Sequence, residues 1–168
     1  MPALSLPSPT GTLTLFSEDD DDGREVLVAV EWGRGSEANG SPLLDETARQ
    51  LDAYFAGQLE DFDLPLAPQG TDFQQAVWQA LVEIPYAVTR TYGDIAGDVG
   101  SVSRAVGQAC GQNPIPIIIP CHRVLAAGGR MGGFSGAGGV DTKRWLLGLE
   151  GAMLRLEAAS GGHGDGGA

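Results

Sequence analysis

A short apolar run framed by prolines restricts the backbone of this chain more than any other feature. In the stretch PIPIIIPCHRV (114–124), prolines stand at positions 114, 116 and 120. Each proline fixes its own φ angle and removes a backbone donor. We therefore predict a short buried strand that holds the residues after it, Cys121, His122 and Arg123, in rigid positions.

Three interpretations compete for the thiol of Cys121: an inert core cysteine, a metal ligand or a nucleophile. The chain has one other cysteine, Cys110, which falls within the apolar stripe of a predicted helix and is interpreted as a core residue. A metal site lacks soft ligands, because the two histidines, His122 and His163, are far apart in sequence. The neighbours His122 and Arg123 favour the nucleophile, since a thiol reacts as its thiolate and needs a base or a positive neighbour.

The cysteine content and the hydropathy pattern indicate a cellular compartment. Two cysteines close together in sequence give no disulfide framework and favour reduced thiols in a cytosol. The start, MPALSLPSPT, has neither a basic nor an apolar signal region, and no apolar run has the length of a membrane span. We expect a soluble cytoplasmic protein with no membrane partner.

The formal charge of −12 argues against binding to nucleic acid, but the charge is unevenly distributed. Residues 1–71 carry 3 basic and 14 acidic side chains, whereas residues 72–157 carry seven of each, so a local basic face is possible there. A single lysine accompanies nine arginines and thirteen aspartates. This bias indicates either adaptation to a high-salt cytosol or a GC-rich genome combined with a solvated acidic loop.

The first part of the chain has the pattern of a small sheet with one helix. TLTLF (12–16) and EVLVAVEW (25–32) are typical of strands, and the acidic turn between them predicts a hairpin. From Asp45 onward, the spacing of Ala48, Leu51 and Phe55 predicts an amphipathic helix that Gly57 closes. The linker LEDFDLPLAPQG then places a domain boundary near residue 70.

The second part, residues 71–157, has the pattern of several short helices. Thr71 and Gln74 form a capping box for a helix that ends before Pro85. TYGDIAGDV (91–99) predicts a short helix, and Ser101 is expected to cap another that ends at Gly111. This pair resembles a helix-turn-helix, a pattern that many helical pairs share. A last helix is expected in DTKRWLLGLEG (141–151), with Asp141 as its cap and Trp145, Leu146 and Leu149 facing inward; the Gly-rich tail 158–168 should be disordered.

Several motifs together resemble the O6-alkylguanine-DNA alkyltransferase family, also called methylated-DNA–protein-cysteine methyltransferases. They are SRAVGQACGQ, the stretch from Asn113 through PCHRV, GGFSG and KRWLLGLEG, and the resemblance runs from about Thr71 to Gly151. It implies an α+β fold: a ribonuclease H-like N-terminal domain (1–70) with a small antiparallel sheet and a helix, and a mostly helical winged helix-turn-helix domain (71–157). It also implies repair of O6-alkylguanine, and of O4-alkylthymine, in double-stranded DNA by a monomer that acts once and needs no cofactor.

The resemblance assigns the chemistry to four residues. Cys121 corresponds to the alkyl acceptor, His122 to the base that activates it through a water, and Glu150 to the carboxylate that orients the histidine. Asn113 corresponds to a hinge residue between the recognition helix and the active-site strand. The product is a thioether that no ordinary route hydrolyses, so each molecule should react once.

The same resemblance assigns residues to the DNA and the flipped base. Arg104 should fill the place that the extruded nucleotide leaves, and Tyr92 should contact the target phosphate and base. The other predicted contacts are Arg123, Pro116, the backbone of Val124, Phe134, and Ser135 as a donor to O6. Phe134 replaces a tyrosine common in the family, the loop AGDVGSVS is about two residues shorter, and the first domain lacks zinc ligands, so no metal is expected.

Two other functions would fit parts of the pattern. Alkyltransferase-like proteins bind lesions without repairing them, but they lack the cysteine that this chain has at position 121. A hydrolase with a Cys-His pair would need an oxyanion site and a turnover step. A stoichiometric alkyl adduct on the protein would distinguish the transferase from both.

Overall fold

The computed structural model of the protein describes residues 1–35, 39–134 and 138–152. Its N-terminal part holds an antiparallel sheet in the order β1-β2-β3, formed by β1 (Ala3–Leu6), β2 (Leu13–Asp19) and β3 (Glu25–Trp32). The predicted hairpin is confirmed, and β2 runs three residues beyond its predicted end. The four-residue strand β1 lies between two prolines and was not predicted from the pattern.

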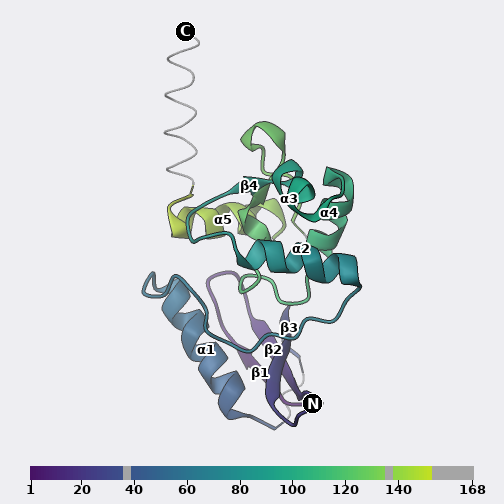
Figure 1. The fold of residues 1–168 in the computed structure, drawn as a ribbon. Helices are drawn as coiled ribbons and strands as arrows, with labels where there is room; N and C mark the ends of the chain where they lie inside the picture. The colour runs from purple at the N-terminus through teal and green to yellow at the C-terminus, as the bar shows by residue number, and fades with distance from the viewer. Residues whose placement is uncertain (36–38, 135–137, 153–168) are drawn as a thin grey trace.

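Helix α1 (Pro42–Phe55) packs along this sheet (Figure 1). The hydroxyl of Ser41 accepts a hydrogen bond from a first-turn amide, and a proline at the first helical position has no amide that needs a partner. The predicted face is only partly right, because Leu51 is buried whereas Ala48 and Phe55 are half-buried. The buried face is rotated slightly from it and consists of Leu44, Thr47, Gln50, Leu51 and Tyr54.

The C-terminal part is mostly helical and lies over the end of the sheet (Figure 1). Its elements are α2 (Asp72–Val82), β4 (Arg90–Thr91), α3 (Tyr92–Val99), α4 (Ser103–Gly111), the 3-10 turn η1 (Cys121–Arg123), β5 (Val124–Leu125), the 3-10 turn η2 (Ala127–Gly129) and α5 (Val140–Glu150). The short strands β4 and β5 pair in parallel. The predicted capping box of α2 is confirmed: the Thr71 hydroxyl accepts from the amide of Gln74, whose side chain accepts from the amide of Thr71. The architecture is the expected α+β fold.

The predicted cap of α4 is wrong. Gly100 ends α3 in the left-handed conformation with φ 70°, and the amide of Ser101 donates back to the carbonyl of Ala96 at 2.9 Å. Ser101 therefore completes the C-terminus of α3. The N-cap of α4 is Val102, whose side chain makes no capping hydrogen bond and is exposed, although the spacing of apolar residues predicts that Val102 belongs to the buried face of this helix.

Helix α5 also differs from its prediction in two places. Its N-cap is Gly139, and Asp141 lies within the first turn, where its negative charge favours the helix dipole. Leu146 is buried as predicted, but Trp145 is 41% exposed and does not face inward. The Trp145 ring instead lies against Phe55 of α1, with 6.2 Å between ring centroids.

The proline-framed run forms a buried loop, and the predicted strand is absent. Residues 115–121 are all buried, but Ile117 has φ 72°, in the left-handed region that a β-branched residue rarely adopts. Asn113 closes the loop: its side-chain NH₂ donates to the carbonyl of Ile119 at 2.8 Å, and its side-chain oxygen accepts from the amide of Ile115 at 2.9 Å. This loop delivers the chain to Cys121.

The two parts of the protein share one hydrophobic core. At the edge of β3 that faces away from β2, the amide of Val30 donates to the carbonyl of Pro114 at 2.9 Å. The N-terminal sheet is therefore hydrogen-bonded directly to the loop that precedes Cys121.

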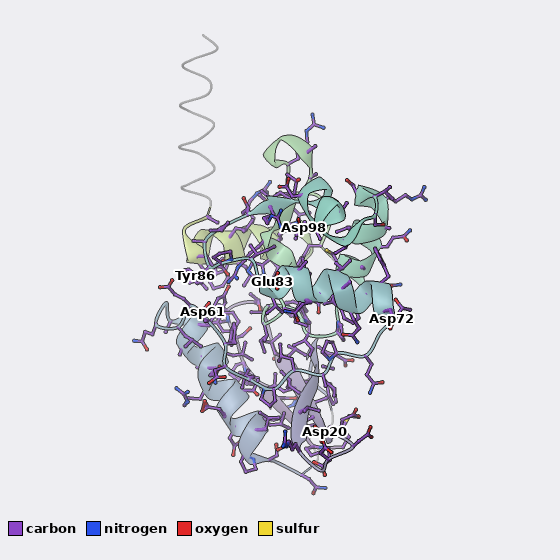
Figure 2. All side chains as sticks on the ribbon, in the orientation of Figure 1. Asp20, Asp61, Asp72, Glu83, Tyr86 and Asp98 are labelled. Atoms are coloured by element: carbon purple, nitrogen blue, oxygen red, sulfur yellow. The ribbon has the colours of Figure 1, made fainter. Side chains whose placement is uncertain are left out.

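Charged side chains lie on the outside of both parts. Figure 2 labels Asp20 beside the sheet, Asp72 at the start of α2 and Asp98 on α3, and all three are exposed. Among the helices in the described ranges, none is both long enough and apolar enough to cross a membrane.

Candidate active site

The thiol of Cys121 lies where two cavities meet. Cys121 opens the short turn η1 directly after Pro120, and only 8% of its surface is exposed. A cavity of about 410 Å³ is bounded by Cys121, Tyr92 and Phe134. A second cavity of about 340 Å³ extends from Cys121 to Trp32 of β3. A small reactant can therefore reach the sulfur although the residue is nearly buried.

His122 follows the thiol and is fully buried. Its Nε2 lies 2.7 Å from Oε2 of Glu150, while its Nδ1 has no hydrogen-bond partner among the residues that the structure describes. Burial lowers the pKa of His122, although the carboxylate of Glu150 opposes this effect. The imidazole is therefore neutral near pH 7, with Nε2–H donating to Glu150 and Nδ1 left as an acceptor. A neutral imidazole with a free acceptor nitrogen is a general base.

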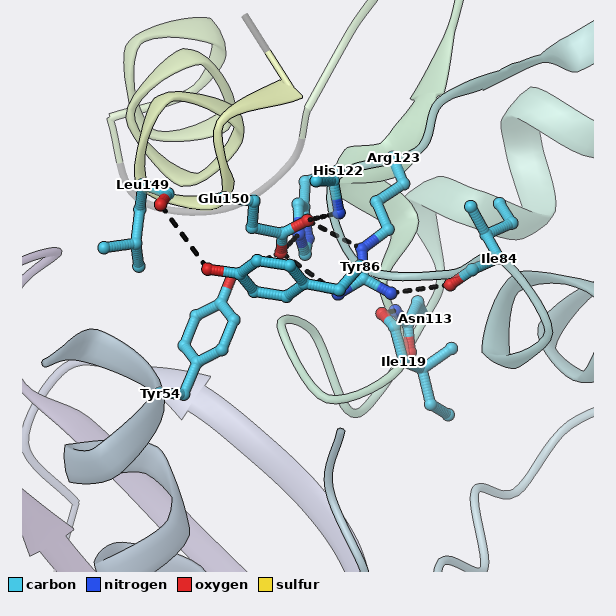
Figure 3. Close-up of polar contacts among 10 residues, drawn as sticks. Tyr54, Ile84, Tyr86, Asn113, Ile119, His122, Arg123, Leu149 and Glu150 are labelled. Carbon is cyan, nitrogen blue, oxygen red and sulfur yellow. Dashed lines mark hydrogen bonds and ion pairs between the residues drawn. The ribbon is translucent and has the colours of Figure 1, made fainter. Parts of the chain in front are cut away.

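The carboxylate of Glu150, on the last turn of α5, is the centre of a buried network (Figure 3). It accepts hydrogen bonds from Tyr54 Oη (2.5 Å), His122 Nε2 (2.7 Å), Arg123 Nε (2.9 Å), Arg123 Nη2 (3.1 Å) and the amide of Ala87 (3.2 Å). Burial by itself raises the pKa of Glu150, but the hydrogen bonds from His122 and Arg123 and the positive charge of Arg123 outweigh it and lower the pKa to about 2. The group is therefore a carboxylate near pH 7.

The position of Arg123 differs from the predicted contact with DNA. The residue is only 5% exposed, and besides Glu150 its guanidinium donates to the carbonyl of Ile84 at 2.6 Å. The guanidinium also lies over the Tyr86 ring, 5.8 Å from its centroid. A buried carboxylate needs a buried positive partner, and Arg123 meets this need inside the protein.

The thiol of Cys121 is protonated at rest. Burial raises its pKa, while a hydrogen bond with the Asn113 side chain and the positive charge of Lys143 lower it to a smaller extent. Lys143 is itself buried, and its ammonium donates to the carbonyl of Gly133 at 3.3 Å. A thiol in this state needs a base before it can react, and His122 is the adjacent residue in the chain.

The structure brings several of the predicted base-contacting residues to the cavities. Tyr92 and Phe134 line the larger cavity with the thiol. Pro116 and Phe134 line the smaller one with it, as does Asn113, which was predicted as a hinge residue. The Phe134 ring packs edge-on against Trp32, with 5.9 Å between ring centroids.

Three other predicted residues lie elsewhere or cannot be placed. Arg104 is exposed in the first turn of α4 and lines neither of these cavities. Val124 is buried in β5, where it pairs with Arg90 of β4. Ser135 lies outside the described residues, as does the tail 158–168.

Three residues of the site and its surroundings were not assigned to it from the sequence. Tyr54 has the sequence signal of a core aromatic on α1, and nothing local links it to a carboxylate 96 residues away. Lys143 reads as a surface lysine at the start of a helix, although it is fully buried. Cys110 was interpreted as a core residue; it is buried, but it also lines both cavities beside Cys121.

Two protein-family models match the chain. The DNA-binding domain of 6-O-methylguanine DNA methyltransferase matches residues 72–152, and the ribonuclease-like domain of the same enzyme matches residues 5–68. Together these matches span nearly all of the described residues.

Individual proteins agree with the family models. A methylated-DNA–protein-cysteine methyltransferase of Methanosarcina acetivorans is 58% identical over 131 residues, which cover 77% of this chain and 80% of the relative. The constitutive enzyme of that name from Bacillus subtilis is 42% identical over 151 residues and is covered to 91%. The crystal structure of Mycobacterium tuberculosis OGT in complex with DNA superposes with a TM-score of 0.77 at 43% identity, covering 89% of this chain and 92% of the other. The chain therefore belongs to the methylated-DNA–protein-cysteine methyltransferase family.

Proposed function

We propose that this protein repairs O6-alkylguanine in DNA by moving the alkyl group onto the sulfur of Cys121, once per molecule. The observation that carries the proposal is the arrangement of three buried groups: a protonated thiol at the junction of two cavities, a neutral imidazole on the next residue of the chain, and a carboxylate bonded to that imidazole. These are a nucleophile, its base and the group that orients the base. DNA with O4-alkylthymine is a second expected substrate.

The transfer step exchanges one bond for another. The S–H proton of Cys121 passes to Nδ1 of His122 through a water, and the sulfur then attacks the alkyl carbon on O6. The S–C bond forms as the C–O6 bond breaks, and the guanine leaves with the electron pair of that bond and takes up a proton. Glu150 stabilises the imidazolium that exists in between. The thioether does not revert, so the protein is consumed without a cofactor.

We assign the binding of duplex DNA to helices α3 and α4 of the C-terminal part. Helices α3 and α4 pack together, and Arg104 is exposed at the start of α4. An exposed arginine at this position can fill the gap in the base stack that the extruded nucleotide leaves. Tyr92, which lines the larger cavity, can then contact the extruded base. We expect a monomer to carry out the reaction, since all groups of the site come from one chain.

Intact-mass measurement after incubation with a duplex that contains O6-methylguanine tests the proposal. The wild-type protein should gain one methyl group per molecule, and peptide mapping should place it on Cys121. Cys121→Ser should gain none while still binding the duplex, because the thiol contributes chemistry and little contact area.

Cys110→Ser is the matched control, since it removes the other buried thiol that lines both cavities. The Cys110→Ser variant should still gain one methyl group on Cys121. An adduct on Cys110, or product formed in excess of the protein, would contradict the proposal and favour a hydrolase.

A further inference from the structure

The shortest hydrogen bond of the Glu150 network comes from the N-terminal part of the protein. Tyr54 lies on the last full turn of α1, is completely buried, and donates its hydroxyl to Oε2 of Glu150 at 2.5 Å. A hydroxyl bonded to a carboxylate is a charge-assisted hydrogen bond, which is stronger than a neutral one. Figure 3 shows the phenol of Tyr54 rising from α1 toward the carboxylate.

The oxygen that Tyr54 contacts is the one that holds the histidine. Oε2 of Glu150 accepts from Tyr54, from Nε2 of His122 and, at 3.1 Å, from Nη2 of Arg123, whereas Oε1 accepts from Nε of Arg123 and from the amide of Ala87. The three donors on Oε2 share the negative charge of one oxygen, and Tyr54 makes the shortest of the three hydrogen bonds. A stronger bond from the phenol therefore leaves less charge for the imidazole.

We propose that Tyr54 is a positioning residue of the transfer site, whose hydroxyl fixes Oε2 of Glu150 against His122 and limits how strongly the imidazole holds a proton. This inference rests on the proposed function, because it assigns Tyr54 to the same base. It also gives the N-terminal part a role in the chemistry, since α1 supplies a group of the site that the C-terminal part lacks.

The packing around Tyr54 fits a fixed donor. Its ring contacts the rings of Phe55, Phe62 and Tyr86, with centroid distances between 5.3 and 6.3 Å. Burial and the neighbouring carboxylate raise the pKa of Tyr54 far above its usual value, so the hydroxyl keeps its proton and only donates. Besides Glu150, the charged or titratable groups that act on Tyr54 or His122 are Arg123, Tyr86 and Lys143.

Tyr54→Phe isolates the hydroxyl, because the phenylalanine ring keeps the packing. Oε2 retains two donors, His122 and Arg123, so the carboxylate is not left without partners. With the phenol gone, more charge on Oε2 stabilises the imidazolium. The pKa of His122, measured by NMR of ¹⁵N-labelled imidazole, should rise by about 0.5 to 1 pH unit.

Tyr86→Phe is the matched control. Its hydroxyl also lies near the site, but it reaches the carbonyl of Leu149 at 3.5 Å and not the carboxylate. This variant should leave the pKa of His122 unchanged. Equal shifts in the two variants, or an unchanged or lowered pKa in Tyr54→Phe, would overturn the proposal.

A measurement on the unmodified protein covers the case in which Tyr54→Phe does not fold. The ¹³Cζ signal of Tyr54 should titrate with the same midpoint as the imidazole of His122, because both groups bond to one oxygen. A Tyr54 signal that does not move through that titration would also overturn the proposal. Neither readout requires alkyl transfer. The two proposals can therefore fail separately: alkyl transfer can be absent while Tyr54 acts on His122, and alkyl transfer can occur while Tyr54 has no such effect.

Discussion

At the scale of single residues, the site depends on a charge balance inside the protein. Glu150 and Arg123 are both buried and neutralise one another, while His122 stays neutral beside them. Removing one partner of a buried ion pair leaves the other charge without compensation. Each of these side chains therefore contributes to stability as well as to chemistry.

The lowered pKa of Glu150 gives a prediction for acid stability. Its ordinary value is 4.5 and its folded value is about 2, so the folded state gains stability from this group above pH 4.5 and loses it as the pH falls toward 2. Urea unfolding of the wild type should show this loss between those two values. Glu150→Gln should be less stable at pH 7, by about 3 to 5 kcal/mol because Arg123 is left unpaired, and should show a smaller loss in that acid range.

Glu46→Gln is the control for this experiment. The pKa of Glu46 is also lowered to about 2, mainly by its hydrogen bond with Arg49, but the pair is on the surface. A surface pair contributes little to folding, so this variant should unfold like the wild type. If Glu150→Gln showed the full acid loss of the wild type, the carboxylate would not be the group responsible.

At the scale of secondary-structure elements, α4 presents its N-terminal end to the solvent. Val102 at the cap is 64% exposed, and Arg104 follows in the first turn. An apolar side chain and a cation exposed together suit a surface that meets stacked bases and phosphates. The short connection from α3, in which Ser101 closes one helix and Val102 opens the next, determines where this end lies.

Arg104→Ala should therefore slow repair in duplex DNA more than reaction with the free base O6-benzylguanine. Arg104 offsets the cost of unstacking and unpairing the target nucleotide, which is a few kcal/mol. The free base is already unstacked, so this cost does not arise. We expect the duplex reaction to slow by about tenfold or more in single-turnover kinetics, with little change for the free base. Arg24→Ala, at an exposed arginine beside the N-terminal hairpin, should change neither. Equal slowing of both reactions in Arg104→Ala would exclude a role in the stack.

The elements that could be predicted from the sequence are those fixed by neighbouring residues. The two residues of the capping box, Thr71 and Gln74, are three positions apart, and the box was identified directly. The cap at Ser101 was wrong because the backbone amide of this residue bonds to the end of the preceding helix, and the local pattern does not say to which of two neighbouring helices a residue between them belongs. The run around Ile117 has strand composition, but a side-chain amide from Asn113 closes it into a loop.

For the site, the resemblance to the family supplied residues that spacing alone could not have joined. Cys121 and His122 are adjacent, yet Glu150 and Tyr54 come from distant helices. Tyr54 lacks any sequence signal for its role, because a buried aromatic on an amphipathic helix is ordinarily a core residue. The resemblance placed Arg123 among the DNA contacts, and its burial follows from a partner 27 residues away, which the sequence around Arg123 does not show.

At the scale of the whole molecule, the acidic charge lies mainly on the N-terminal part, away from the helix pair proposed to bind DNA. Exposed aspartates on the hairpin between β2 and β3 repel one another in dilute buffer, and salt screens this repulsion. If the chain is adapted to a high-salt cytosol, its unfolding temperature should rise from dilute buffer to molar KCl. The rise should be about 2–4 °C for each kcal/mol of repulsion that is screened.

A hairpin variant makes the salt experiment specific. Asp20 accepts hydrogen bonds from the amides of Asp22 and Arg24 and should be kept. Replacing Asp19, Asp21 and Asp22 with asparagine should raise stability in dilute buffer and reduce the salt effect. Equal wild-type stability in dilute buffer and molar salt would instead favour the GC-rich interpretation of the composition.

The hydrogen bond from Val30 to the carbonyl of Pro114 has a consequence for how the molecule opens. The amide proton of Val30 exchanges with solvent only when the edge of β3 parts from the loop that precedes the thiol. Its exchange rate therefore reports how favourable this opening is. The same proton would show whether DNA or an alkyl group on the sulfur makes these separations rarer or more frequent.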